Sequence, residues 1–227
     1  AGEEYDHDDE DEEWLRDGPG ATARFRSPNG LALHAQGRLL VIDYMNGRIR
    51  RVTSAGETTT IGGADGPRVD EMPSGIVVAK DGSTLVSRDY SHLICTLSAE
   101  GTLTTLAGSR GGGGFVDGRG EAARFYSPYG MAEGPDGNIY VADHHNHSIR
   151  RVDRQGNVTT VAGGGPVSRH EDAQTIDGDL TVARFKFPTA VAVASDGTIY
   201  VGEGRDMFLT AGVRALADGV VSTVLDT

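Results

Sequence analysis

The residues best suited to chemistry in this chain are three histidines that follow an aspartate: His144, His145 and His147 after Asp143. Imidazole and carboxylate groups are common zinc ligands. Adjacent residues at a strand end point to opposite faces, however, so His144 and His145 do not readily face one ion. We therefore expect structural or surface roles and no cofactor, and keep Asp143, His144 and His147 as weak candidates for a divalent cation site.

Acidic residues also recur at one position of the chain's internal repeat. Asp43, Asp143 and Glu203 each end a run of strand-forming residues. A catalytic centre needs different groups that converge, whereas the same acid at the same repeat position is typical of a structural hydrogen-bonding residue. We expect each carboxylate to accept hydrogen bonds from backbone N–H groups of the turn that follows it.

Basic residues recur as well, with Arg50 and Arg150 at equivalent positions, each followed by a second arginine. Guanidinium groups could bind phosphate or RNA. With two lysines, 6% aromatic residues and an excess of acids, the chain lacks the broad basic surface that nucleic-acid binding requires. We expect Arg50 and Arg150 to form ion pairs between repeats with the recurrent acids, and we expect no nucleic-acid partner.

The elements that must position these residues come from a fourfold repeat. Shifting the chain by ~100 residues places residues 117–132 on 17–32, and anchoring prolines recur at Pro28, Pro73, Pro128 and Pro188. Each copy reads as four short strands separated by Gly turns, with apolar–charged alternation in the third strand. The predicted units are residues 17–63, 64–108, 109–163 and 164–227.

Four antiparallel strands per unit is the plan of a propeller blade, in which neighbouring blades bury each other's faces. The predicted fold class is therefore all-β, a β-propeller of four-stranded antiparallel blades. The repeats run in phase from the first strand of one blade to the fourth strand of the last. We therefore expect part of a larger ring, or blades completed by another chain, with a closed four-bladed disc as the alternative.

The repeat closely resembles the NHL repeat over roughly residues 17–227. The motifs that carry the resemblance are RF-x-x-P-x-G, D-G-x-φ-Y-V-A-D, N-H-x-I-R-R-V and V-T-T-V-A-G, best preserved in the third copy. The second copy departs, with Arg88 at the position of Asp43 and Cys95 at the position of Arg50. The resemblance implies a propeller, typically six-bladed, that contacts proteins or RNA.

The first residues differ in composition from the body of the chain. Residues 1–17 hold ten acids and one arginine, so residues 1–16 are expected to form a disordered acidic tail. No apolar run is long enough to span a bilayer, so no transmembrane segment is expected. The start at Ala1 without a leader leaves a removed targeting peptide, and an extracellular or lumenal location, open.

In a repeat protein, binding specificity comes from positions whose residues differ between otherwise similar repeats. Such positions lie beside the anchoring prolines: Asn29, Ser74, Tyr129 and Thr189. We expect them to form a contact face. The sequence thus predicts a non-catalytic scaffold for protein–protein interaction or assembly. The alternatives are a metal-dependent, lactonase-like hydrolase or lyase on the same architecture, and then RNA binding.

Overall fold

The computed structural model describes residues 14–34, 37–63, 72–164, 174–204 and 212–226, and within them it confirms the all-β class. The 3-10 turns within these ranges are η2 (Tyr44–Asn46), η4 (Gly120–Ala122) and η5 (His144–Asn146). Across these ranges, no helix has the length and apolar character needed to cross a membrane.

Four antiparallel sheets follow one another along the chain, and we call them blades 1 to 4. Blade 1 holds β1 (Pro28–His34), β2 (Arg38–Asp43), β3 (Arg48–Val52) and β4 (Thr58–Gly63). Blade 2 holds β5 (Gly75–Val78), β6 (Thr84–Arg88), β7 (Leu93–Leu97) and β8 (Leu103–Gly108). Blade 3 holds β10 (Pro128–Glu133), β11 (Ile139–Asp143), β12 (Ser148–Val152) and β13 (Asn157–Gly163). Blade 4 holds β15 (Pro188–Val193), β16 (Ile199–Glu203), β17 (Gly212–Ala217) and β18 (Val220–Leu225).

In blades 1, 3 and 4 the chain leading into the blade runs along that blade's own outer edge. β9 (Gly118–Arg119) pairs with β13, and β14 (Gly178–Asp179) pairs with β18, which gives blades 3 and 4 a fifth strand. In blade 1 a single bridge joins Gly18 to Thr58 in the same way. We call residues 14–26, 116–126 and 176–186 the leading segments. Trp14 and Arg16, which the sequence analysis assigned to the tail, belong to the first of them.

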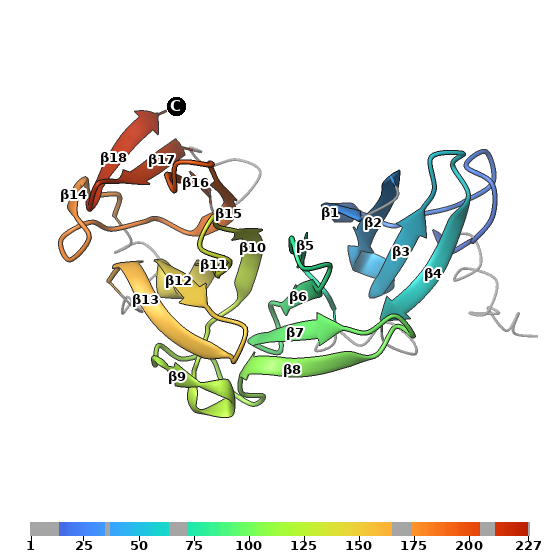
Figure 1. The fold of residues 1–227 in the computed structure, drawn as a ribbon, viewed down its shortest axis with the longest axis horizontal. Helices are drawn as coiled ribbons and strands as arrows, with labels where there is room; N and C mark the ends of the chain where they lie inside the picture. The colour runs from blue at the N-terminus through green and yellow to red at the C-terminus, as the bar shows by residue number, and fades with distance from the viewer. Residues whose placement is uncertain (1–13, 35–36, 64–71, 165–173, 205–211, 227) are drawn as a thin grey trace, which may run out of the picture.

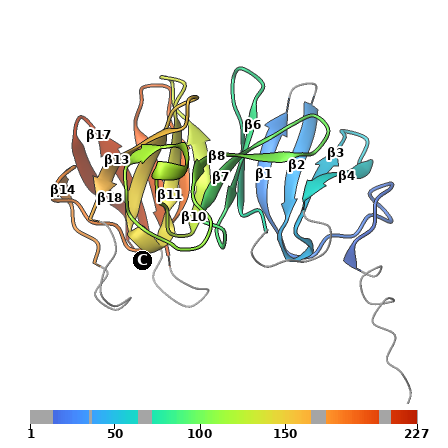
Figure 2. The same cartoon turned by 90° about the horizontal axis from the view of Figure 1, so that it is seen from below.

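The blades lie along an open arc, with their first strands toward the inside (Figure 1). Figure 2 shows the same row of blades from below, with blade 1 and blade 4 at its two ends. An apolar cluster fills each interface between neighbouring blades: around Ile42 and Val86, around Ile94 and Phe125, and around Ile149 and Val201. The core therefore lies between sheets, as in a propeller.

Glycine at the turn before the fourth strand lets neighbouring blades approach closely. Gly101 has a φ of +87°, and a Cβ placed there would lie 1.7 Å from the Ile61 carbonyl oxygen of blade 1. Gly156 repeats this approach in blade 3, against the Leu106 carbonyl of blade 2. These glycines meet both the positive φ of the turn and the space limit of the interface.

Candidate functional site

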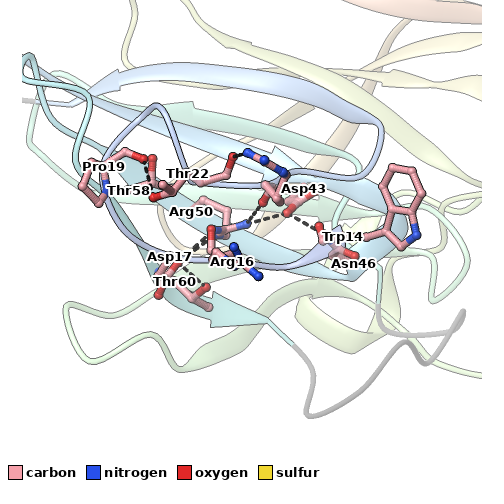
Figure 3. Close-up of polar contacts among 12 residues, drawn as sticks. Trp14, Arg16, Asp17, Pro19, Thr22, Asp43, Asn46, Arg50, Thr58 and Thr60 are labelled. Carbon is pink, nitrogen blue, oxygen red and sulfur yellow. Dashed lines mark hydrogen bonds and ion pairs between the residues drawn. The ribbon is translucent and has the colours of Figure 1, made fainter. Parts of the chain in front are cut away.

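The most densely bonded polar group of blade 1 centres on Arg50 of β3, whose side chain is fully buried (Figure 3). Its guanidinium donates to Asp43 Oδ2 at 2.7 Å and to Asp17 Oδ1 at 2.8 Å. It also donates to the carbonyl oxygens of Arg24 (2.9 Å) and Arg16 (2.8 Å). A planar fork of donors is suited to holding several oxygens at once, so Arg50 ties the leading segment to the sheet.

Asp43, at the end of β2, is the buried acid of this group. Its Oδ1 accepts from the Arg26 N–H at 2.6 Å, and its Oδ2 accepts from the Asn46 amide at 2.8 Å. The same amide donates to the Trp14 carbonyl at 2.8 Å (Figure 3). The expectation that backbone N–H groups of the following turn bind Asp43 is wrong, because the turn η2 makes no such side-chain cap. The backbone donor comes from the leading segment.

The second acid of the group, Asp17, comes from the leading segment itself. Its carboxylate accepts from the Thr60 N–H at 2.8 Å and from the Thr60 hydroxyl at 3.1 Å. Partial burial opposes ionisation, but these bonds and Arg50 hold the pKa of Asp17 below its usual value. Asp17 is not among the site residues predicted from the sequence, although the Asp-Gly pair recurs at Asp117 and Asp177 and could have indicated its role.

Blades 3 and 4 repeat the arrangement. Arg150 bonds Asp143 (2.8 Å) and Asp117 (2.7 Å), and Asn146 again donates to the buried acid. In blade 4, Arg214 bonds Asp177 and, at 3.3 Å, Glu203. Each ion pair lies within one blade, so the prediction that Arg50 and Arg150 form ion pairs between blades is wrong. The alternation of residues along a strand indicates which face an arginine lies on, but it does not identify the acid that the arginine binds.

The phenylalanine of the Arg-Phe motif packs on the same guanidinium. The Cζ atom of Arg50 lies 4.7 Å from the Phe25 ring centre, and that of Arg150 lies 5.3 Å from the Phe125 ring centre. Such contacts are favourable for a desolvated cation. The motif shared by the repeats therefore builds one unit: acid, arginine, aromatic ring and leading segment.

The buried acid of blade 3 is fully committed to this unit. Burial raises the pKa of Asp143 to about 6, against the opposing effects of Arg150, Asn146 and the Tyr126 N–H. Both carboxylate oxygens are bonded, Oδ1 by the Tyr126 N–H and Oδ2 by Asn146 and Arg150. Neither oxygen is left to act as a general acid or base, so the role of this carboxylate is structural. We call the buried acid, its arginine and the acid of the leading segment, here Asp143, Arg150 and Asp117, the clasp.

Blade 2 lacks the clasp, as its sequence departures indicated. Arg88 is buried at the position of the acid, and Cys95 is buried at the position of the arginine. Burial raises the pKa of the Cys95 thiol, and Arg88 opposes this rise. A buried thiol with a raised pKa is a poor nucleophile.

The three histidine rings pack around the Phe187 ring, but the ring nitrogens of His144 and His147 make separate polar contacts. His147 Nδ1 accepts from the Phe187 N–H at 3.2 Å, and His144 Nδ1 lies 3.2 Å from the Pro188 carbonyl oxygen. The His145 ring packs against Tyr126. Within the described ranges, no three His, Cys, Asp or Glu side chains are grouped as metal ligands.

The four candidate contact residues lie at or next to the beginnings of the first strands, in unequal surroundings. Asn29 is exposed, Tyr129 and Thr189 are half-buried, and Ser74 is buried. The Ser74 hydroxyl lies 3.2 Å from the Pro128 carbonyl oxygen of the next blade, so this residue joins two blades. A contact face at these positions remains a prediction for Asn29, Tyr129 and Thr189.

Tyr129 belongs to a polar cluster that sequence reasoning missed. The Tyr44 hydroxyl donates to Asp89 Oδ2 at 3.2 Å, across the interface of blades 1 and 2. Burial raises the pKa of Asp89, and burial with the nearby Asp89 raises the pKa of Tyr129 to about 12. Tyr44, Asp89 and His144 share one repeat position and differ in type, which is the signal that could have located the cluster.

Comparison with known proteins agrees with this repeat structure. A model of the NHL repeat matches residues 125–152, which cover β10, β11 and β12 of blade 3. The NHL repeat-containing protein 2 of Gallus gallus is 42% identical over 97 residues, which are 41% of this chain and 13% of that protein. The chain therefore spans a small part of this curated relative.

Solved structures share the blade architecture. A protein of unknown function from Bacteroides thetaiotaomicron is 25% identical at a TM-score of 0.68, with 78% of this chain and 44% of that chain covered. Virginiamycin B lyase from Staphylococcus aureus is 13% identical at a TM-score of 0.56, with 86% and 54% covered, a likeness of fold alone. This chain therefore carries an NHL repeat at residues 125–152, and its repeated units fold as β-propeller blades.

Proposed function

We propose that the chain is a non-catalytic scaffold that binds another protein by docking a further NHL-type blade on an end of the arc. The observation that carries this proposal is a difference in burial between equivalent repeat positions. Apolar side chains that are covered in the middle of the arc are open to solvent at its ends. Clustered exposed apolar residues mark protein interaction sites.

The end face of blade 1 is built on β1. Leu31 and Leu33 are 64% and 73% exposed and lie on one face of the strand. In blade 3 the residue equivalent to Leu31 is Met131, which is 8% exposed and packs in the cluster shared with blade 2. Leu31 therefore occupies a position that a preceding blade covers elsewhere in this molecule.

The end face of blade 4 corresponds to the opposite face of a blade, on which the following blade packs elsewhere in the molecule. Tyr200 and Leu225 are 41% and 60% exposed. The equivalents of these residues in inner interfaces are Leu40 and Ala162, which are 3% and 1% exposed and lie in the clusters shared with the following blade. Blade 4 therefore presents the side on which a following blade packs.

These two end faces are complementary in repeat type. The exposed face of blade 4 is equivalent to the face of blade 1 that packs on blade 2. The exposed face of blade 1 is equivalent to the face of blade 2 that packs on blade 1. Blade 4 of one copy can therefore dock on blade 1 of a second copy in a head-to-tail contact. Copies of this chain thus supply a partner of the proposed kind.

Native mass spectrometry over a range of concentrations tests this proposal. We expect species heavier than one copy whose share rises with concentration. The L31K/L33K variant should lose them, because two ammonium groups cannot be desolvated against an apolar face. Tyr90→Lys is the control, since Tyr90 is 54% exposed on blade 2, away from both ends. A single copy at every concentration, or equal association by L31K/L33K, would contradict the proposal.

The alternative activity, that of a metal-dependent hydrolase or lyase, has its own test. Metal analysis of the purified protein should find no stoichiometric Ca²⁺ or Zn²⁺ if the chain is a scaffold. One tightly held ion per chain would favour the enzyme.

A further inference from the structure

The interfaces between neighbouring blades differ in the charged residues at equivalent repeat positions. Between blades 2 and 3, Arg154 bonds Glu133 at 2.7 Å and the Ser83 hydroxyl at 3.0 Å. Between blades 3 and 4, a cavity of about 330 Å³ is lined by the acids Asp196 and Asp218. Arg154 is thus paired with an acid at the first interface, whereas the cavity at the second interface is acidic.

The groove between blades 1 and 2 is basic. It encloses about 210 Å³, and its lining includes Arg38 and Arg51 but no acid. Leu40 is paired with Arg51 in the sheet and lies two residues from Arg38, so all three side chains share the face turned toward blade 2. Neither guanidinium has an ion pair or hydrogen bond within the described part of the chain. Two cations that line one half-buried groove repel each other, and an anion between them would relieve that cost.

The floor of this groove is apolar. Leu40, Ile61 and Leu97 line it beside the two arginines, and Leu40 is buried in the interface core. Polar groups of blade 2 border it, including the Ser98 residue and the backbone of the turn at Gly82. Concave sites with an apolar floor and a few convergent charges are suited to small molecules.

We propose that this groove binds a small amphiphilic anion, with its carboxylate or phosphate between Arg38 and Arg51 and its apolar part on Leu40, Ile61 and Leu97. A guanidinium presents paired donors to either kind of oxyanion, so both head groups belong to one ligand chemistry. The site lies between blades and is separate from the end faces, so it does not depend on docking of a further blade.

Calorimetric titration of the full chain with phenyl phosphate tests the proposal, with benzoate as the carboxylate arm. We expect binding to one site with a Kd of about 1 mM or tighter for either compound. Inorganic phosphate should bind at least ~10-fold more weakly, because it lacks the apolar part. Equal affinity for inorganic phosphate would overturn the role of the apolar floor.

Charge-removing variants locate the site. We expect R38Q and R51Q each to weaken phenyl phosphate binding by ~10-fold or more, and the double variant to abolish it. Arg151→Gln is the matched control, because Arg151 is the repeat equivalent of Arg51 and donates to the Thr159 hydroxyl at 3.2 Å. The control should bind as the parent does. Binding that survives R38Q/R51Q, or a parent chain that binds neither compound, would overturn the proposal.

Amide chemical shifts keep the test independent of variant folding. In the parent chain, phenyl phosphate should shift resonances of residues 82–84 and 97–99, which border the groove. Shifts confined to the acidic groove at residues 196–199 and 216–219 would overturn the assignment.

Discussion

The middle of the arc and its ends are made from the same repeat, yet they differ in how far equivalent apolar residues are exposed to solvent. In the middle, each blade covers both faces with its neighbours, and Met131 and Ala162 are almost inaccessible. At the ends, Leu31 and Leu225 occupy the equivalent positions in solvent. Burial at these positions is therefore set by the neighbouring blade and not by the residue or the strand that carries it, so the same substitution should have different effects in the two places.

The largest expected effect is that of a charge in an inner interface. Met131→Asp places a carboxylate in the cluster shared by blades 2 and 3, and we expect a loss of about 4 kcal/mol or more in the free energy of unfolding. Leu31→Asp, at the exposed equivalent, should change it by less than ~0.5 kcal/mol at protein concentrations low enough to keep the chain as a single copy. Urea denaturation of both variants makes the comparison. Similar losses would show that the end face is as covered as an inner one.

Removing the buried acid of the clasp should be costly wherever the blade lies. Asp143→Ala leaves Arg150 without its fully buried partner, and Asp43→Ala does the same to Arg50. We expect each to cost about 3 to 5 kcal/mol without changing association through the end faces. Equal costs in the two blades would confirm that the clasp acts within one blade. Thermal melts identical to the parent would contradict a structural role.

Close approach between blades is tested by two glycines with almost the same backbone conformation. Gly82 (φ +86°) has open space where a Cβ would be, whereas a Cβ on Gly101 (φ +87°) meets the Ile61 carbonyl. Gly82→Ala should cost about 1 to 2 kcal/mol. Gly101→Ala should cost about 2 to 5 kcal/mol, because the interface must also move. If both cost the same, the turn does not limit the packing of blade 2 on blade 1.

The strands and their turns could be predicted from the sequence because each depends on local pattern: alternation, Asp-Gly turns and Thr/Val-rich outer strands. The partners of Arg50 could not be predicted in the same way. Asp17 lies 33 residues away in the chain, and only the return of the leading segment along the sheet brings it to the guanidinium. The Tyr44–Asp89 contact likewise crosses two blades.

The smallest expected effect is that of acid on the exposed half of the clasp. Partial burial opposes ionisation of Asp117, but bonds from Thr160 and Arg150 lower its pKa. Ionised Asp117 therefore contributes fully to the free energy of unfolding at pH values above 3.8, its usual pKa. This contribution is lost as the pH falls through the lower pKa that Asp117 has in the folded chain. The side chain is half exposed, so solvent screening limits this to well under ~1 kcal/mol. Below pH 4, Asp117→Asn should lose less stability than the parent; parallel acid curves would contradict this.

Crosslinking between copies tests the head-to-tail contact most directly. In a Cys95→Ser background, chains carrying Leu33→Cys are mixed with chains carrying Leu225→Cys and treated with a short bismaleimide. We expect a crosslinked pair that contains one chain of each kind, formed well above the level seen when Tyr90→Cys replaces either partner. No crosslink between Leu33→Cys and Leu225→Cys chains, or the same yield with the Tyr90→Cys control, would contradict docking of blade 4 on blade 1.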